Sequence, residues 1–240
     1  MTGEHDTFTR MLSLAVHELR TPVTVVNGYL RMVLKGQGGP LSEKQRKMLE
    51  EAERSCERIG QLVSQMSEVG KLDAGELALA RQDVDMAALL AEVAKDMHEG
   101  ADRGVTVDLR AVDRPLVIVG DRARLSAALR ALLHATLRER VEPGSVIAEC
   151  SIVANPVPSV VIAIGDADIV QTILRTVPDD SQAFDEWRGG VGLTLPLARR
   201  VIAAHGGSLW SARGVRPCDG SAVRLPLKSA SDSGLQASGA

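Results

Sequence analysis

The chain has 240 residues, of which 45% are apolar and 25% are charged, a balance that is ordinary for a globular protein of two small domains. Its net charge is only −3, it contains no run of Lys and Arg, and aromatic residues make up 2% of it. These features exclude a typical nucleic-acid-binding protein, which needs a basic surface or a base-stacking platform.

No apolar stretch approaches the ~20 residues needed to cross a bilayer, and the polar first residues contain no signal-peptide core. We therefore expect a cytoplasmic chain without a membrane span. The cysteines Cys56, Cys150 and Cys218 are too few and too scattered for a disulfide framework or a zinc site. We expect three reduced thiols and predict no metal site built from them.

Two long helices are predicted at the start of the chain. In each, apolar residues recur at alternating spacings of four and three, the heptad pattern of helices packed at a shallow angle. The first stripe consists of Phe8, Leu12, Ala15, Leu19, Pro22, Val26, Tyr29 and Val33. The second stripe consists of Leu49, Ala52, Cys56, Ile59, Val63 and Met66.

The ends of these helices are marked by turn and capping residues. Glycines and a proline at 36–40 should end the first helix, and Pro22 should kink it. Ser42 and Gln45 have the capping-box spacing that begins the second helix, which glycines at 70 and 75 should close. A hairpin of two such helices has an apolar face that it cannot cover alone. Pairing two hairpins into a four-helix bundle predicts a homodimer.

From about residue 76 the pattern changes to short strands and helices. Helices are predicted over 86–99, 122–140 and 191–205. Strands are predicted over 105–112, 116–119, 146–153 and 159–164, with a turn at 155–158 between the last two. A final strand pair is predicted to contain Trp210 and Val223. Residues 167–188 show no clear period and are predicted to form a loop. The pattern favours an α+β sandwich with its helices on one face. The small, polar residues 229–240 are predicted to be a disordered tail.

The first helix contains the segment His17-Glu18-Leu19-Arg20-Thr21-Pro22. His17 lies between two stripe positions, off the seam, and should face solvent. A lone histidine is more often a satisfied surface or core residue. Here the whole hexapeptide, on such a helix and followed by a second one, resembles the phospho-acceptor box of sensor histidine kinases.

The resemblance implies a role for three residues of this segment. A neutral imidazole of His17 can attack a phosphorus atom and hold phosphate as a labile phosphoramidate. Glu18 would accept the imidazole proton or orient the ring. Thr21 stands where the family uses Thr or Asn to position water against a phosphorylated response regulator.

The resemblance extends over roughly residues 8–227, and in the second half it implies an ATP-binding domain of the Bergerat type. Domains are therefore predicted at 1–75, 76–228 and, for the tail, 229–240. Aligning Leu132 and Leu133 places Ala135 where the family has the Asn that ligates Mg²⁺, and Arg138 where a phosphate-contacting Lys is common. Ala135 has no oxygen with which to bind a hard cation.

The family's glycine boxes are only partly present. Asp166 follows a strand and matches the aspartate that hydrogen-bonds adenine, but Ala167 and Asp168 stand where the family's glycine box continues. Asp166 could equally be a surface carboxylate at a strand end. The second box is intact: Gly190, Gly192 and Leu193 precede a helix, whose free N–H groups suit phosphate. His205, in the His-Gly-Gly segment that follows, is expected to be structural, and Phe184 could be the lid phenylalanine.

Two functions follow from this resemblance. The first is a protein-histidine kinase that uses Mg²⁺ and ATP to phosphorylate His17 and passes the phosphate to the receiver domain of a response regulator. The second is a pseudokinase that acts as phosphatase, phosphotransfer protein or dimeric scaffold without ATP-driven autophosphorylation, which the missing Asn and glycines favour. No sensor domain is recognisable in the chain. Its input is expected from an upstream sensor protein or from sequence outside this chain.

Overall fold

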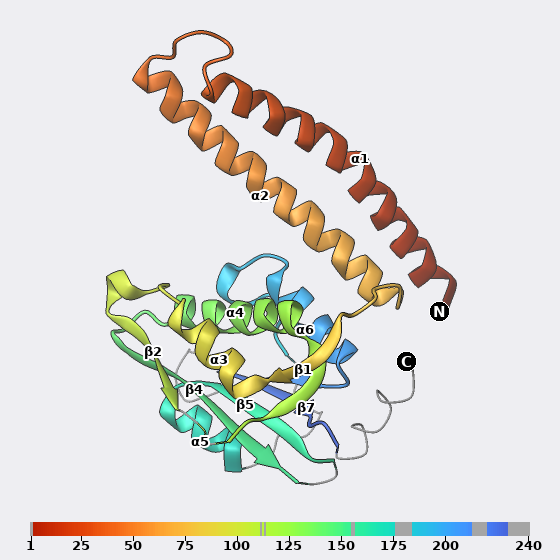
Figure 1. Cartoon of the computed structure of the whole chain (residues 1–240), viewed down its shortest axis with the longest axis vertical. Helices are drawn as coiled ribbons and strands as arrows, with labels where there is room; N and C mark the ends of the chain where they lie inside the picture. Colours follow the sequence, from red (N-terminus) through yellow and green to blue (C-terminus); the bar gives the residue numbers. More distant parts are fainter. Residues whose placement is uncertain are drawn as a thin grey trace, which may run out of the picture. The chain divides into compact units, whose positions relative to one another are not determined.

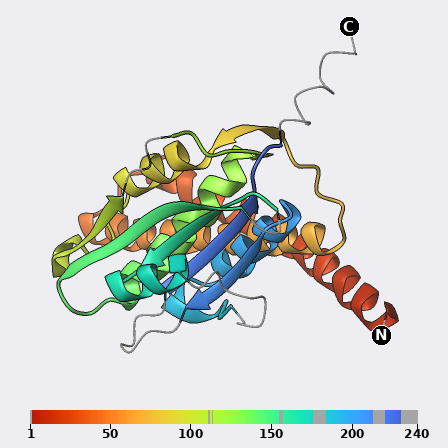
Figure 2. The same ribbon diagram turned by 90° about the horizontal axis from the view of Figure 1, so that it is seen from below.

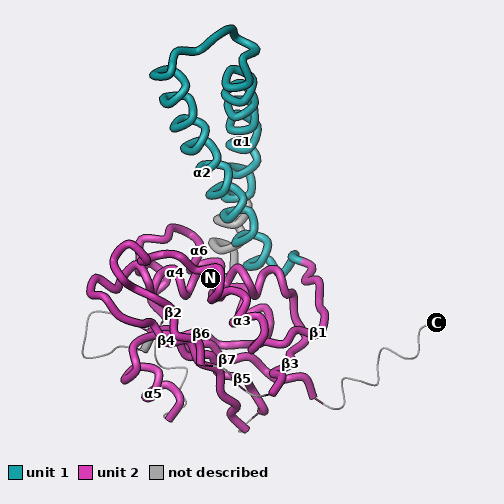
Figure 3. The backbone as a smooth tube through the Cα atoms, turned by 60° about the vertical axis from the view of Figure 1, so that its left-hand side comes forward, with its two compact units in different colours: residues 1–77 teal, residues 78–240 magenta. Residues whose placement is uncertain are grey.

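A computed structural model describes residues 2–110, 112, 114–154, 157–175, 184–212 and 220–229. The chain forms two compact units, Met1–Leu77 and Ala78–Ala240 (Figure 3). The predicted turn at 155–158 lies partly outside the described residues, as does the predicted tail except for its first residue.

The first unit is a hairpin of two helices, α1 (Thr2–Leu34) and α2 (Glu43–Asp73) (Figure 1). The predicted capping box is confirmed, because the Gln45 backbone N–H donates to Ser42 Oγ at 3.3 Å and the Ser42 N–H donates to Gln45 Oε1 at 2.9 Å. Helix α1 continues through Pro22. Gly70 does not end α2, which continues to Asp73 and stops before Gly75. No described helix is long and apolar enough to span a bilayer.

The hairpin buries one set of apolar side chains and leaves another exposed. Val16, Cys56 and Val63 are buried between the helices. Stripe residues such as Tyr29, 64% exposed, and Ile59, 48% exposed, point away from that contact. The first stripe is therefore mostly a second apolar face, which a single hairpin leaves uncovered. The side chain of Phe8, its first member, lies outside the described residues.

The second unit contains two sheets. A small antiparallel pair joins β1 (Arg81–Asp85) to β3 (Val117–Asp121). The main sheet has the order β2-β4-β5-β7-β6, in which β2 and β4 are parallel and the other neighbours are antiparallel. Its strands are β2 (Val105–Arg110), β4 (Gly144–Val153), β5 (Ser159–Gly165), β6 (Ser208–Ala212) and β7 (Gly220–Pro226).

Three helices cover one face of the main sheet: α3 (Met86–Lys95), α4 (Arg122–Glu139) and α6 (Thr194–Ala204) (Figures 1 and 2). Every residue of β5 is buried, so the sheet is covered on both sides at its centre. The predicted class, an α+β chain with a helical hairpin followed by an α/β sandwich, is confirmed. Short turns of 3₁₀ helix occur at η1 (Ala101–Arg103) and η2 (Arg188–Gly190).

The other sheet face carries a helix that the sequence did not predict. Residues 167–175, expected to be loop, form α5 (Ala167–Arg175), which lies on the side of the sheet opposite to α3, α4 and α6 (Figures 1 and 2). Ile169, Val170 and Ile173 pack there with Trp210 in one buried cluster. The prediction was wrong because nine residues are too few to show a helical period, and their apolar face becomes visible only against the sheet.

Smaller differences concern element boundaries. Strand β1 was not predicted. Helix α3 is capped by Asp85, which accepts from the N–H groups of residues 87 and 88, and it ends at Lys95 and not at residue 99. Helix α6 begins at Thr194, because Gly192 has a φ of +66° that interrupts helical backbone. The predicted final strand pair is present, with Leu209 opposite Val223.

Candidate functional site

His17 presents its imidazole to solvent from the middle of α1. Its side chain is 78% exposed, as the sequence predicted, and that of Glu18 is 72% exposed. His17 Nδ1 lies 3.4 Å from Glu18 Oε1. A carboxylate at this distance favours the proton on Nδ1, which leaves the Nε2 lone pair directed at solvent. The pair is therefore arranged for attack by Nε2 on an external electrophile.

Thr21 and an open groove lie on the same side of α1 as His17. Thr21 is exposed and follows His17 by four residues, about one helical turn. Between α1 and α2 runs a groove of about 920 Å³. Its lining includes Arg20, Thr24, Gly28, Gly60, Gln61 and Ser64. Residues 20 and 24 are three and seven positions from His17, so the groove begins beside the imidazole.

The start of α4 is held by a buried polar cluster. Asp121 caps α4 through the Arg124 N–H and also accepts the Ala80 N–H. Burial of Asp121 opposes its ionised form, but these hydrogen bonds and the Arg124 guanidinium outweigh burial and lower the pKa of the carboxyl. The ring of His205 accepts the Asp121 N–H at Nε2, 2.9 Å away, and its Nδ1 lies 2.7 Å from the Val201 carbonyl. These contacts support the expected structural role of His205.

Ala135 lies on the buried face of α4 beneath the backbone of Gly189. It has no exposed surface. A Cβ placed on Gly189 would lie 2.9 Å from both Cα and Cβ of Ala135, so the contact requires small residues on both sides. Arg138, three residues further along α4, is exposed. The position assigned to the Mg²⁺ ligand therefore has no oxygen atom and is buried.

Asp166 is engaged by a side chain of the same chain. It forms an ion pair with Arg140, and the two side chains are 20% and 15% exposed. Asp166 thus accepts a hydrogen bond from the Arg140 guanidinium, in the place of the one that an adenine amino group would donate.

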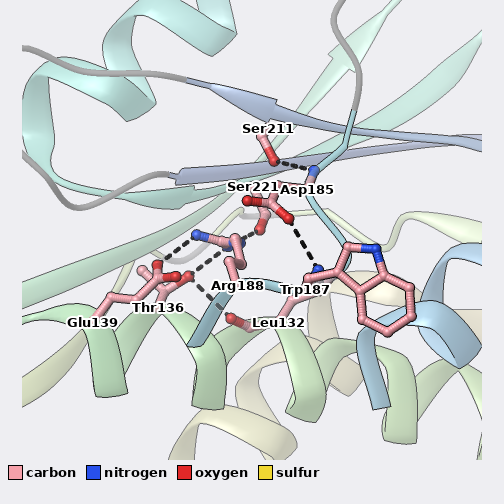
Figure 4. A network of polar contacts seen from close by, with 8 residues as sticks. All are labelled: Leu132, Thr136, Glu139, Asp185, Trp187, Arg188, Ser211 and Ser221. Carbon is pink, nitrogen blue, oxygen red and sulfur yellow. Dashed lines mark hydrogen bonds and ion pairs between the residues drawn. The ribbon is translucent and has the colours of Figure 1, made fainter. Parts of the chain in front are cut away.

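A second guanidinium fills the niche between α4 and β7 (Figure 4). The Arg188 side chain is 3% exposed. It donates to Glu139 Oε2 at 2.8 Å, to Thr136 Oγ1 at 3.1 Å and to Ser221 Oγ at 2.5 Å. Three acceptors and one negative charge are the partners that a buried guanidinium needs.

The segment before Arg188 is held in place as well. Phe184 is buried, the Asp185 N–H donates to Ser211 Oγ at 3.0 Å, and the Trp187 N–H donates to Asp185 Oδ1 at 3.0 Å (Figure 4). Residues 184–189 thus connect β6 to α4 through a chain of contacts.

The second glycine box has the backbone that the sequence suggested. Gly190 and Gly192 have φ values of +59° and +66°, and Leu193 leads into α6 without a side-chain cap. The first N–H groups of α6 therefore donate no hydrogen bond to the side chain of that cap residue.

Three features of this site differ from what binding of Mg²⁺ and ATP would require. The metal position is a buried alanine, Asp166 is bound by Arg140, and the niche beside it is filled by Arg188. Sequence reasoning missed Arg140 and Arg188. Their partners lie 26 to 52 residues away along the chain, and nothing local marks such pairs.

The chain is similar to known proteins in both of its units. Residues 9–75 match the family described as the His Kinase A (phospho-acceptor) domain. The chain is 28% identical over 219 residues to the sensor protein DivL of Caulobacter vibrioides, covering 88% of this chain and 27% of DivL. It is 30% identical over 226 residues to the probable sensor histidine kinase TcrY of Mycobacterium tuberculosis, covering 89% of this chain and 44% of TcrY. The chain thus spans less than half the length of these relatives.

Solved structures show the same fold. Full-length ShkA in complex with AMPPNP matches with a TM-score of 0.69 at 22% identity, over 92% of this chain and 46% of ShkA. The histidine kinase AdeS of Acinetobacter baumannii matches with a TM-score of 0.57 at 20% identity, over 89% of this chain and 98% of AdeS. The likeness covers both units of the chain.

Proposed function

Because the chain belongs to the sensor histidine kinase family, we propose that it carries phosphate on His17 and exchanges it with an aspartate of a response-regulator receiver domain. The observation that carries this proposal is the exposed imidazole, with Glu18 beside Nδ1 and Nε2 open to solvent. A separate protein can reach this nitrogen without any movement of the hairpin.

The transfer exchanges one bond to phosphorus for another. His17 Nε2 attacks the phosphorus of the receiver's aspartyl phosphate, an N–P bond forms, and the P–O bond to the aspartate breaks and releases its carboxylate. The reverse reaction returns the phosphoryl group to an aspartate. Glu18 holds the Nδ1 proton and stabilises the positive charge that develops on the ring.

The groove beside His17 is proposed as the receiver's docking surface. It is lined by polar and apolar residues of both helices, and one of them, Arg20, follows His17 by less than one helical turn. Thr21, exposed on the next turn, is proposed to position water against the receiver's aspartyl phosphate, which would make the same surface a phosphatase site.

A homodimer is proposed through the uncovered apolar face of the hairpin. The exposed residues Leu19, Val26, Tyr29 and Ile59 supply that face. A second copy would bury both faces in a four-helix bundle. An upstream sensor protein is the proposed source of the signal.

Of the two sequence-based hypotheses, we propose the one in which ATP is not the phosphate donor. The specific observation is Gly189 lying on Ala135, which leaves no oxygen ligand for Mg²⁺. Incubation with γ-labelled ATP should therefore give little or no acid-labile label on His17. Rapid, Mg²⁺-dependent labelling would contradict this and restore the autokinase hypothesis.

The phosphotransfer proposal is tested with a panel of purified receiver domains that carry labelled aspartyl phosphate. The unmodified chain should acquire acid-labile, base-stable phosphohistidine, and His17→Ala should acquire none. His134→Ala is the matched control, because His134 also lies beside a glutamate, with Nε2 3.0 Å from Glu99 Oε2. Label that persists in His17→Ala would refute the assignment.

A further inference from the structure

Two arginines of the second unit place their guanidinium groups on the polar atoms of its nucleotide-like site. Arg140 pairs with Asp166, and Arg188 contacts Glu139, Thr136 and Ser221. Both guanidinium groups are largely buried, and each has a carboxylate partner. Desolvating two cations is costly, so these pairs form only because the niche supplies complementary acceptors.

The niche lies next to the aspartate that the resemblance assigns to the adenine base. Ser221 on β7 is opposite Ile164 on β5, and Ile164 precedes Asp166 by two residues. Thr136 and Glu139 form the facing wall, on the last turns of α4. The Arg188 guanidinium therefore occupies the end of the site at which a base would be bound.

A guanidinium and an adenine base share the chemistry that this niche recognises. Both are planar and offer N–H donors in their plane, and carboxylate or hydroxyl oxygens accept them. Arg140 gives Asp166 the kind of donor that the adenine amino group would give. Glu139 adds a negative charge, which favours the cationic arginine over a neutral base.

We propose that Arg140 and Arg188 are built-in ligands of the base end of the nucleotide site, where they take the place of adenine and keep the site closed. The second unit then folds around its own side chains and needs no nucleotide to complete it. The acceptor groups that contact the two arginines would remain available to another planar N–H donor if the arginines were removed. This proposal concerns the second unit alone and does not depend on phosphate transfer by His17.

The closure extends beyond the two side chains. Gly189 packs on Ala135, Phe184 is buried, and the Asp185 N–H is bound to Ser211, so the segment that delivers Arg188 is held on both sides of it. A ligand can enter only when the guanidinium groups leave. The apparent affinity for a base is therefore reduced by the small fraction of molecules that are open.

The test is binding of adenosine, a probe without phosphate or metal, to the full chain and to the double variant Arg140→Ala/Arg188→Ala. The unmodified chain should show no shift of its thermal unfolding midpoint with adenosine. The double variant should be stabilised by adenosine and bind it about tenfold or more tightly than the unmodified chain. Arg199→Ala is the matched control, since Arg199 is an exposed arginine paired with Glu186, and it should behave like the unmodified chain.

Two results would overturn the proposal. One is a folded double variant, shown by circular dichroism, that binds adenosine no better than the unmodified chain. The other is tight adenosine binding by the unmodified chain. If the double variant does not fold, Glu139→Gln keeps the shape of the niche and removes the charge that holds Arg188. Its adenosine affinity must then exceed that of the unmodified chain, and an unchanged affinity overturns the proposal.

Discussion

In the hairpin the reactive imidazole of His17 is 78% exposed, whereas in the second unit the Arg188 guanidinium is 3% exposed. The hairpin thus presents its imidazole to solvent, where another molecule can reach it, and the second unit satisfies the Arg188 guanidinium with its own side chains. A phosphate carrier needs the first arrangement, since its partner must reach the nitrogen. A domain whose buried polar site holds no ligand is stabilised by the second arrangement, because unfilled buried acceptors would destabilise it.

The apolar residues show the same contrast. All of β5 is buried in its own unit, while Tyr29 of the first stripe and Ile59 of the second are exposed in a single hairpin. The second unit is complete as a folded body, and the hairpin becomes complete only with a partner. Four predictions test this contrast.

The largest effect is expected from Ile59→Asp, at an exposed apolar position of α2. Burying an unpaired carboxylate between two hairpins should cost about 3 kcal/mol or more and raise the dimer dissociation constant a hundredfold or more. Light scattering over a concentration series measures this. Gln61→Asp, on the groove side of α2, should leave the dimer intact, and an unmodified chain that is monomeric at micromolar concentration would refute the proposed interface.

Ala135→Asn tests the second unit, at the position that the resemblance assigns to the Mg²⁺ ligand. Sequence alignment alone predicts that asparagine here would restore a Mg²⁺ ligand, but in the structure it would meet the Gly189 backbone. We expect a loss of about 1–3 kcal/mol in the free energy of unfolding, from overpacking, and no gain in Mg²⁺-dependent ATP binding. Urea titration and calorimetry measure the two outcomes. Ala127→Asn, exposed on the same helix, should cost less than about 0.7 kcal/mol.

The buried ring of His205 should make the second unit acid-sensitive. Burial lowers the pKa of His205, although its hydrogen bond with Val201 acts in the opposite direction. As the pH falls, the imidazole is therefore protonated in the unfolded chain before it is protonated in the folded chain. Its contribution to stability is complete above about pH 6.5 and is lost as the pH falls towards the lowered pKa, with a slope of at most about 1.4 kcal/mol per pH unit. The Asp121 contribution, through a lowered carboxyl pKa, is lost only at more acidic pH.

Urea unfolding of the unmodified chain and of His205→Gln, at several pH values between 7.5 and 5, measures the His205 contribution. Glutamine can still accept the Asp121 N–H but does not titrate, so the slope between pH 6.5 and 5 should flatten in the variant. Identical slopes in both proteins would exclude His205 as its source.

The smallest effect is expected from Thr21→Ala. Phosphate transfer to and from His17 should be unchanged, while dephosphorylation of the receiver should slow by roughly threefold to tenfold, because a positioned water is lost. Ser55→Ala is the control, since Ser55 is an exposed hydroxyl residue of α2 that does not line the groove. Equal rates for both variants would remove Thr21 from the mechanism.

The sequence predicted most of the hairpin because its signals are local. The capping box at Ser42, the exposure of His17 and the uncovered stripe all follow from spacings of three or four residues. The final strand pair and helix α4 were predicted nearly as well. Their periods are long enough to be recognised without knowledge of the neighbouring elements.

The second site could be predicted only in part. The missing Asn and glycines were visible in the sequence, and they indicated weak nucleotide binding. What occupies the site was not visible, because Arg188 and its partners on α4 and β7 are brought together by folding. Helix α5 was not predicted for the same reason, because its apolar side chains pack on strands that only folding brings beside them. Ile169 of α5, for example, lies so close to Gly165 at the end of β5 that a Cβ on Gly165 would be 3.0 Å from Ile169 Cγ2.

The sequence by itself determined the two helices, the exposed His17 and the absence of an oxygen ligand at Ala135, since these depend on residue type and on short-range helical geometry. Only the tertiary structure decided that α5 covers the far face of the sheet and that Arg140 and Arg188 fill the nucleotide-like site. A buried charge is stable only where distant segments supply its partners, so its position is a property of the whole fold.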